Sequence, residues 1–287
     1  MNRIKSSLAN IYRWFHPRFQ HLFLEYKVTF KPRYGHGKPP HEALYAMVDA
    51  NRSRYAELLE ASLTYIENIK TIRDASQGDS GVEPVWNSGY LPGLDIIGIY
   101  TMLSELKPET YFEVGSGNST KVAYKAISEQ KLGTKIISVD PAPRAEIDQI
   151  ADTIVRQPFE ETDLKALFQL KANDVLFIDN SHRILPNSDS MVFFLAVLPK
   201  LASGVVVQIH DIYIPYDYPQ FMCDRFYSEQ YGLAIWLLSN PERFEILLPN
   251  YFISEDSALS EMVVPFWEQP GLNNVERHGG SFWFRIR

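Results

Sequence analysis

The sequence predicts a doubly wound α/β fold, in which helices cover both faces of a mostly parallel β-sheet. Two observations predict it. Short apolar segments of strand length alternate with segments of helix length between residues 94 and 209. A glycine-containing turn also joins one such strand, 110–114, to the helix that follows it. Strands that alternate with helices at this spacing form a parallel sheet through right-handed crossovers.

The predicted elements build a domain of residues 84–287 around a seven-stranded sheet. Two strands follow the last long helix near the end of the chain, and we expect one of them to run antiparallel to the rest. The predicted helices are 95–106, 119–130, 189–200 and 221–238. The predicted strands are 110–114, 135–139, 153–155, 175–178, 205–209, 244–248 and 281–286.

Residues 1–83 are predicted to form a separate N-terminal helical region. Apolar side chains recur three and four positions apart from Ile4 to Tyr26, which predicts an amphipathic helix that Pro17 kinks or breaks. A Pro/Gly-rich stretch, 31–40, precedes a second helical region, 41–73. We expect the first helix to dock on the domain or on a second subunit of a homo-oligomer. Peripheral membrane contact is the alternative.

Charge and cysteine content restrict the class of protein. Residues 1–37 carry seven Lys or Arg and one acid, so with a net charge of −7 the rest of the chain is strongly acidic. Because phosphate contacts dominate affinity for nucleic acids, an acidic body argues against them and favours a small-molecule substrate. The single cysteine, Cys223, excludes an internal disulfide, and no signal peptide is recognisable, so we expect a cytoplasmic protein.

The segment 111–120, YFEVGSGNST, predicts a nucleotide-type binding site. A strand ends near Glu113, and Gly115 and Gly117 let the chain turn sharply, so that a ligand reaches the N-terminus of the next helix. The next strand ends at Asp140, about 20 residues further on. A carboxylate there accepts hydrogen bonds from the hydroxyls of a ribose.

Two residues of this turn argue against a dinucleotide. The third glycine that a dinucleotide fold places close to its pyrophosphate is Thr120 here. The carboxylate of Glu113 would repel a pyrophosphate but would suit a cationic amino or sulfonium group. A nicotinamide-dependent oxidoreductase is therefore the less favoured interpretation.

The Glu-x-Gly-x-Gly pattern, followed by Asp140, resembles the class I S-adenosylmethionine-dependent methyltransferases, which have a Rossmann-like fold. The resemblance implies that the turn lines the methionine end of S-adenosylmethionine and that Asp140 holds its ribose. The third glycine of the family is Ser119 in this chain. By position, Phe159 and Glu160 lie near the adenine. The implied cofactor-binding residues are Glu113, Gly115, Ser116, Gly117, Ser119, Asp140, Phe159 and Asp179.

A second group of polar residues follows two later strands. The strand 175–178 ends in Asp179 and is followed by His182, while the strand 205–209 ends in His210 and Asp211. Because parallel strands open their carboxyl ends on one edge of the sheet, we expect these four side chains to converge near the glycine turn. The flanking segments 86–92 and 213–219 are placed to form walls of the pocket.

The motifs Phe-Ile-Asp-x-Ser-His and Ile-His-Asp-Ile resemble the bacterial macrocin-type O-methyltransferases, which are similar in layout to the catechol type. The resemblance implies that Asp179 and Asp211 bind a divalent cation such as Mg²⁺ and that His182 is the general base. Ile212 stands where catechol-type enzymes have an Asn, so His210, Asp189, substrate oxygens or water would have to complete the metal site.

We therefore interpret the chain as a methyltransferase that acts on a hydroxyl of a sugar or secondary metabolite. A neutral histidine suits this chemistry, because the hydroxyl loses a proton as it attacks the methyl group. Three alternatives stay open: N-methyl transfer or aminopropyl transfer on the same fold, and a binding subunit without catalysis.

Overall fold

The computed structural model describes residues 12, 14–17, 20, 22–78, 81–143 and 145–287. Its helices are α2 (Glu42–Asp49), α3 (Arg52–Leu63), α4 (Ile66–Ile69), α5 (Gly93–Leu106), α6 (Asn118–Glu129), α7 (Asp189–Val192), α8 (Gln220–Cys223), α9 (Glu229–Ser239), α10 (Asn250–Glu255), α11 (Ser257–Glu261) and α12 (Val264–Trp267). Its strands are β1 (Arg73–Asp74), β2 (Val85–Trp86), β3 (Thr110–Val114), β4 (Lys135–Val139), β5 (Thr153–Val155), β6 (Val175–Ile178), β7 (Val206–Ile209), β8 (Phe244–Pro249) and β9 (Phe282–Ile286). Short 3₁₀ and π-helical turns join some of them.

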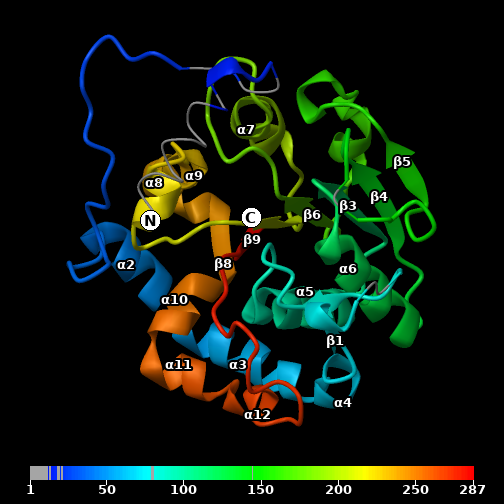
Figure 1. Cartoon of the computed structure of the whole chain (residues 1–287). Helices are drawn as coiled ribbons and strands as arrows, with labels where there is room; N and C mark the ends of the chain where they lie inside the picture. The colour runs from blue at the N-terminus through cyan, green and yellow to red at the C-terminus, as the bar shows by residue number, and fades with distance from the viewer. Residues whose placement is uncertain (1–11, 13, 18–19, 21, 79–80, 144) are drawn as a thin grey trace.

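The main sheet confirms the predicted fold class. It has seven strands in the order β5-β4-β3-β6-β7-β9-β8. The first five are parallel to one another, whereas β9 runs antiparallel to both of its neighbours, β7 and β8. Helices α5 and α6 lie on one side of this sheet and α7 and α9 on the other (Figure 1). The strand order reverses direction between β3 and β6, so the carboxyl ends of these two strands flank the position where such folds bind ligands.

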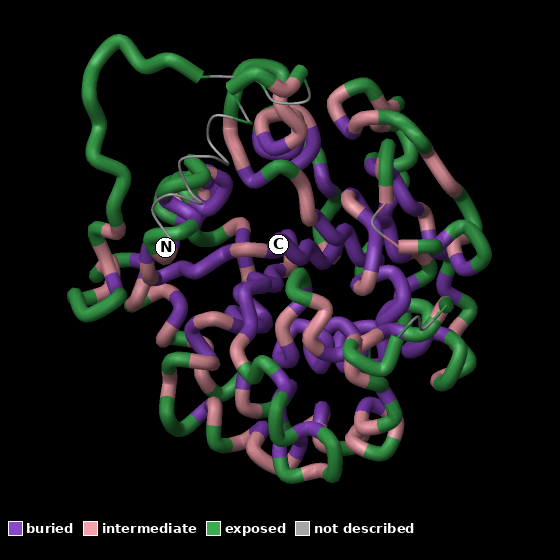
Figure 2. The backbone as a smooth tube through the Cα atoms, in the orientation of Figure 1, coloured by how far each residue is buried: buried purple, intermediate pink, exposed green. Residues whose placement is uncertain are grey.

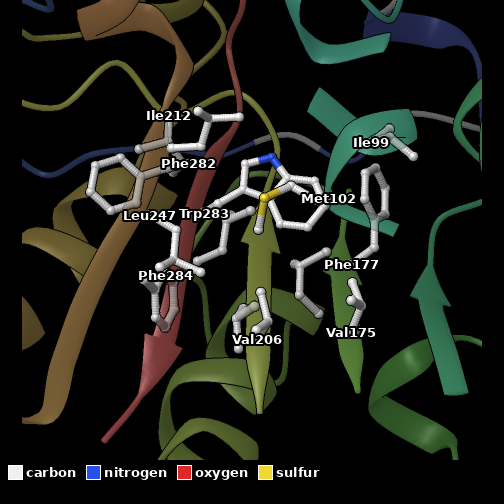
Figure 3. Close-up of a cluster of buried hydrophobic side chains, with 14 of the residues drawn as sticks. Ile99, Met102, Val175, Phe177, Val206, Ile212, Leu247, Phe282, Trp283 and Phe284 are labelled. Atoms are coloured by element: carbon white, nitrogen blue, oxygen red, sulfur yellow. The ribbon is translucent and has the colours of Figure 1, made fainter. Parts of the chain in front are cut away.

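The core lies between the central strands and the helices that cover them. Strands β3, β6, β7, β8 and β9 are almost entirely buried, while the N-terminal segment is mostly exposed (Figure 2). Ile99 and Met102 of α5 pack against Phe177 of β6, and Trp283 of β9 lies in the same cluster (Figure 3). Burial of such side chains contributes about 1.5–3 kcal/mol each. The carboxyl ends of the strands are therefore held by a rigid scaffold.

The predicted N-terminal helix is only partly present in the described residues. Helix is present at Trp14 and Phe15, but residues 22–30 are not helical; residues 1–11, 13, 18, 19 and 21 lie outside the described part of the chain. Phe23 and Tyr26 are 75% and 74% exposed. Since helices are stabilised mainly by burying an apolar face, a stripe that the domain does not cover does not suffice to form one.

The predicted helical region 41–73 contains three helices, and the predicted long helix 221–238 is interrupted. The region 41–73 forms α2, α3 and α4, and Thr64 ends α3 by donating its hydroxyl to the carbonyl of Ala61, 2.7 Å away. The predicted helix 221–238 is split into α8 and α9, because Phe226 adopts a left-handed conformation (φ +61°) that a helix does not tolerate. Helices α10 to α12 and the short parallel pair of β1 and β2 were not predicted. No helix in the described residues is long and apolar enough to cross a membrane.

Candidate active site

The glycine turn brings the ends of β3 and β6 into direct contact. Gly115 has a φ of +82°, and a Cβ atom at this position would lie 1.9 Å from the carbonyl oxygen of Asp179. The amide of Asp179 donates to the carbonyl of Val114 at 2.8 Å, and the amide of Gly115 donates to that of Val139 at 3.0 Å. Only glycine fits both this conformation and this space. Gly115 therefore sets the position of Asp179 as well as the shape of the turn.

Glu113 is placed behind the turn, and it does not line the two cavities described below. Its buried carboxylate accepts hydrogen bonds from Ser119 Oγ at 2.6 Å, from the Thr120 hydroxyl and from the Tyr111 hydroxyl at 3.1 Å. Burial raises the pKa of Glu113 to about 8, against the effect of these hydrogen bonds. The side chain that we expected at the methionine end instead ties the first turn of α6 to β3.

Two cavities open on either side of the turn. The first has a volume of about 410 Å³ and is lined by residues including Gly115, Asp140, Phe159, Glu160 and Asp179. The second, about 250 Å³, is lined by residues including Ser88, Tyr90, Gly117, Ser119 and Lys121. Ser116 and Asp179 line both. The predicted adenine, ribose and methionine contacts, apart from Glu113, are thus assembled along one continuous surface, and the segment 86–92 contributes to its wall as expected.

Asp140 is held at the edge of the first cavity by two backbone amides. Its Oδ2 accepts a hydrogen bond from the amide of Ser116 and its Oδ1 accepts one from the amide of Ala142, both at 2.8 Å. The Ser116 hydroxyl lies 2.5 Å from that of Ser138. These contacts fix the carboxylate, which keeps lone pairs for the hydroxyls of a ribose.

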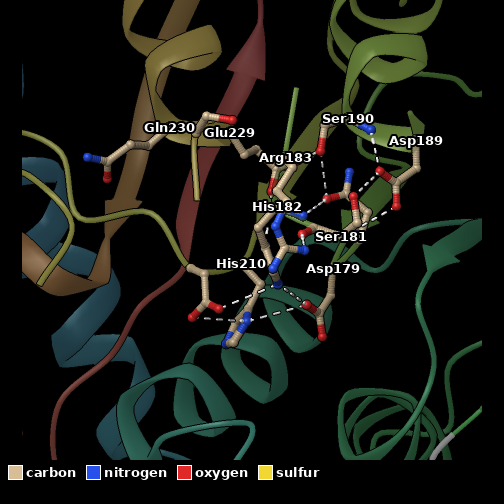
Figure 4. A network of polar contacts seen from close by, with 12 residues as sticks. Asp179, Ser181, His182, Arg183, Asp189, Ser190, His210, Glu229 and Gln230 are labelled. Carbon is tan, nitrogen blue, oxygen red and sulfur yellow. Dashed lines mark hydrogen bonds and ion pairs between the residues drawn. The ribbon is translucent and has the colours of Figure 1, made fainter. Parts of the chain in front are cut away.

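His182 lies at the carboxyl end of β6, between three carboxylates (Figure 4). Its Nδ1 is 3.1 Å from Glu229 Oε2, and its Nε2 is 3.3 Å from Asp179 Oδ1 and 3.5 Å from Asp211 Oδ2. The expected convergence of Asp179, His182, His210 and Asp211 is thus present, with Glu229 as a fifth member.

Glu229 was missed because its contact depends on the break between α8 and α9. The amides of Ser228 and Glu229 both donate to the carbonyl of His182, at 2.9 and 3.2 Å, which anchors the start of α9 on this residue. The fully buried Glu229 side chain then meets the His182 ring. The sequence carries no distinct signal for Glu229, because the predicted helix 221–238 also contains the charged residues Asp224 and Arg225.

The charges around His182 determine its protonation. Burial by itself would lower the pKa of His182, but hydrogen bonding to Asp179 and Glu229 and the charge of Asp211 outweigh it and raise the pKa to about 10. Burial opposes the ionised form of Asp179 as well, yet His210 and His182 hold its pKa well below the usual range. The group therefore behaves as a set of coupled ion pairs.

His210 also lies among carboxylates, those of Asp95, Asp179 and Asp211. Its Nε2 lies 3.3 Å from Asp95 Oδ2, and its Nδ1 lies 3.6 Å from both Asp179 Oδ1 and Asp211 Oδ1. Asp95 is fully buried on α5 and also accepts hydrogen bonds from the amides of Gly280 and Ser281 at 2.8 and 3.0 Å. His210 thereby links α5 and the start of β9 to the site.

The metal site expected from Asp179, Asp211 and His210 is not supported. The described residues contain no group of three or more His, Cys, Asp or Glu side chains placed to hold a metal ion. The carboxylates of Asp179 and Asp211 face imidazole rings instead. Asp189, the further candidate ligand, accepts hydrogen bonds from the amide and hydroxyl of Ser181 at 2.7 and 2.6 Å.

Residues 30–41 support the loop that follows Asp211. The amide of Arg33 donates to Asp217 Oδ2 at 2.7 Å, and the amide of Asp217 donates to the carbonyl of Tyr34 at 3.1 Å. A Cβ atom on Gly35 (φ +68°) would lie 2.7 Å from Cβ of Tyr216. We expected this stretch to belong to a separate N-terminal region. In the structure it packs against the segment 213–219, which we expected to form a wall of the pocket.

Comparisons with known proteins agree with this site. A family model described as a methyltransferase domain matches residues 112–212, which include the glycine turn, Asp140, His182 and Asp211. No curated protein sequence matches the chain. Residues 112–212 therefore match a methyltransferase domain, and this match does not support the nicotinamide-dependent alternative.

Several solved structures are similar. An S-adenosylhomocysteine-bound methyltransferase of Podospora anserina, PaMTH1, is 15% identical, with a TM-score of 0.41, over 88% of this chain and all of its own. The O-methyltransferase of Bacillus cereus in complex with S-adenosylhomocysteine is 12% identical (TM-score 0.40; 80% of this chain, 90% of its own). The plantazolicin methyltransferase BpumL, in complex with a pentazolic desmethylPZN analog and S-adenosylhomocysteine, is 14% identical (TM-score 0.42; 66% of this chain, 83% of its own).

The two glycines of the turn should respond differently to alanine. G115A should lower the melting temperature strongly or prevent folding, because its Cβ meets the Asp179 carbonyl and its φ is positive. G117A should fold almost normally, because a Cβ there has no neighbour within 4 Å. Thermal unfolding followed by circular dichroism measures both. Equal stability of the two variants would contradict the role given to Gly115.

Substituting Glu229 should lower the pKa of His182. In E229Q one of the carboxylates that favour the imidazolium is replaced by a neutral amide of the same shape, so the neutral ring becomes more favourable. NMR of ¹³C-histidine-labelled protein measures this, with H182Q assigning the signal. Q230N, which changes a neighbouring buried side chain without changing charge, is the control. An unchanged titration in E229Q would contradict the pairing.

Proposed function

We propose that the chain transfers the methyl group of S-adenosylmethionine to a hydroxyl of a small molecule, with His182 as the general base. The observation that carries this proposal is the orientation of the His182 ring. Glu229 engages Nδ1, and Nε2 faces Asp179, the residue shared by both cavities. A base fixed at one nitrogen by a carboxylate, with the other nitrogen directed at the site, is the arrangement that proton transfer requires.

The residues of the glycine turn fit the donor. In this proposal Asp140 binds the ribose hydroxyls, Phe159 contacts the adenine, and Ser116, Gly117 and Ser119 surround the methionine end. In support, all five residues line the two cavities. When bound, S-adenosylmethionine supplies an electrophilic methyl group on a sulfonium, which needs no activation by the protein. The contribution of these residues is therefore alignment of the acceptor with the methyl group.

His182 then takes the proton of the acceptor hydroxyl. In the neutral ring, Nδ1–H donates to Glu229 and the lone pair of Nε2 accepts the proton. The resulting imidazolium is stabilised by Asp179, Asp211 and Glu229. The same carboxylates keep much of His182 protonated at neutral pH, since they raise its pKa to about 10.

The proposal assigns no role to a metal ion, and an amine acceptor is its main alternative. We derive no step through Mg²⁺, because the imidazoles of His182 and His210 already compensate Asp179 and Asp211. An amine acceptor or an aminopropyl product is the alternative on the same fold. Analysis of the product formed from labelled donor distinguishes them, since an aminopropyl product gains a nitrogen, and an N-methyl product carries the labelled methyl group on nitrogen instead of oxygen.

S-Adenosylhomocysteine should bind through Asp140. We expect micromolar binding of the purified chain in a calorimetric titration, with the same affinity in the presence and absence of Mg²⁺. D140A should weaken binding about tenfold or more, because hydrogen bonds to a charged group contribute about 1.5–3 kcal/mol. D163A, which removes an exposed carboxylate distant from both cavities, is the control. No binding by the unaltered chain would overturn the proposed cofactor.

The rate should depend on pH through His182. Because only the neutral ring accepts a proton, a raised pKa predicts that kcat/KM rises with pH from 6 to 9 and levels off near 10. H182Q should lower kcat by about 10²–10⁴-fold and flatten this profile, with the affinity for S-adenosylhomocysteine retained. Transfer from labelled donor to a panel of sugars and phenols measures it. A loss of less than tenfold would count against this base.

A further inference from the structure

A tyrosine connects the candidate base to two arginines. The buried Tyr227 ring is stacked on His182, with 4.7 Å between ring centroids and an interplanar angle of 27°. The Cζ atom of Arg225 lies 4.6 Å from the centre of the same Tyr227 ring, and that of Arg183 lies 5.4 Å from it. Both guanidinium groups therefore contact the ring that stacks on His182. Figure 4 shows Arg183 beside His182.

Neither guanidinium is neutralised within the described residues. Arg183 donates from Nε to the carbonyl of Arg225 at 2.9 Å and from Nη1 to the carbonyl of Ser181 at 3.0 Å. The described part of the chain places no carboxylate within 4.0 Å of either group. Arg183 is only partly buried and Arg225 is exposed. Two positive charges with free donors thus remain accessible next to the site.

These two cations and the acids of the site act on Tyr227 in opposite directions. Apart from burial, the ionisation of Tyr227 responds to Asp211 and Asp179, which raise its pKa, and to Arg225 and Arg183, which lower it. Their positions are fixed by the backbone. Arg183 directly follows His182, and the segment between α8 and α9 that carries Arg225 is anchored by the amide of Ser228 on the His182 carbonyl.

Packing alone does not account for two arginines here. One guanidinium over an exposed part of an aromatic ring contributes about 0.5–1 kcal/mol, and the second adds repulsion between like charges. The charge of the described domain is otherwise strongly acidic, so an anionic acceptor would be repelled without a local group of cations. Guanidinium groups bind carboxylate and phosphate oxygens through paired hydrogen bonds.

We propose that Arg183 and Arg225 bind an anionic group, a phosphate or a carboxylate, on the acceptor whose hydroxyl is methylated. This inference rests on the proposed function and narrows its substrate class to anionic hydroxyl compounds such as sugar phosphates or sugar acids. With the anionic group held across Tyr227, the hydroxyl reaches Nε2 of His182. The arginines act in binding and orientation, not in proton transfer.

The test is calorimetric titration of the full chain with glucose 6-phosphate, glucuronate and glucose, each with and without S-adenosylhomocysteine. We expect one or both acids to bind and glucose not to bind. R183Q and R225Q should each weaken binding of the acids at least tenfold, because glutamine keeps hydrogen-bond donors but loses the charge. K200Q removes another cation that lies over an aromatic ring, that of Phe168, away from both cavities, and should leave binding unchanged.

Each outcome decides the proposal. Equal binding of glucose and the acids, no binding of either acid, or acid binding that R183Q and R225Q do not weaken would overturn the anionic subsite. A preference for glucose 6-phosphate or for glucuronate assigns the phosphate or the carboxylate. Binding of S-adenosylhomocysteine should be the same in R183Q, R225Q and the unaltered chain. If S-adenosylhomocysteine does not bind to the unaltered chain, the proposed function is overturned. The titrations of the acids without S-adenosylhomocysteine still test the arginines in that case.

Discussion

The site depends on the contact between the backbones of Gly115 and Asp179. Their strands, β3 and β6, adjoin where the sheet order reverses, and the absence of a side chain at Gly115 lets the two carboxyl ends meet. This contact separates the two cavities while giving both of them Asp179 as a wall. It also sets where the chain leaves β6, and therefore where His182 stands relative to the cofactor surface. If a methyl group at position 115 pushed β6 away from β3, Asp179 would shift in both cavities and His182 would shift relative to them.

Electrostatic compensation explains how so many ionisable groups are tolerated in one buried place. His182 and His210 are each placed among carboxylates, and the desolvation that would neutralise an isolated histidine is outweighed by these partners. Burial raises the pKa of Glu229, and the hydrogen bond and charge of His182 oppose this effect. The arrangement favours a positive charge on His182, which is the state that the ring reaches after accepting a proton.

Local sequence patterns were sufficient for the elements and turns that lie close together along the chain. The apolar strands, the glycine turn and the acids at strand ends follow from periodicity and from the geometry of parallel sheets, which also predicts their convergence. Local patterns could not predict the contacts that Glu229 and Tyr227 make with His182, or the packing of residues 30–41 against the loop after Asp211. Each depends on a contact between distant segments, and Glu229 also depends on a helix break at Phe226 that the apolar pattern conceals. The N-terminal helix was wrong over residues 22–26 because periodicity does not reveal whether a partner surface exists.

The position of β9 has a consequence for how the protein acquires its shape during synthesis. β9 lies inside the sheet, between β7 and β8, although it follows β8 along the chain. Until residues 282–286 have left the ribosome, β7 and β8 have no shared neighbour and both present unpaired edges. The segment 279–281, which precedes β9, also supplies the amides that bind Asp95 beneath His210. The half of the sheet that holds the cofactor surface can therefore form early, whereas the acid–histidine group is completed only when β9 is inserted.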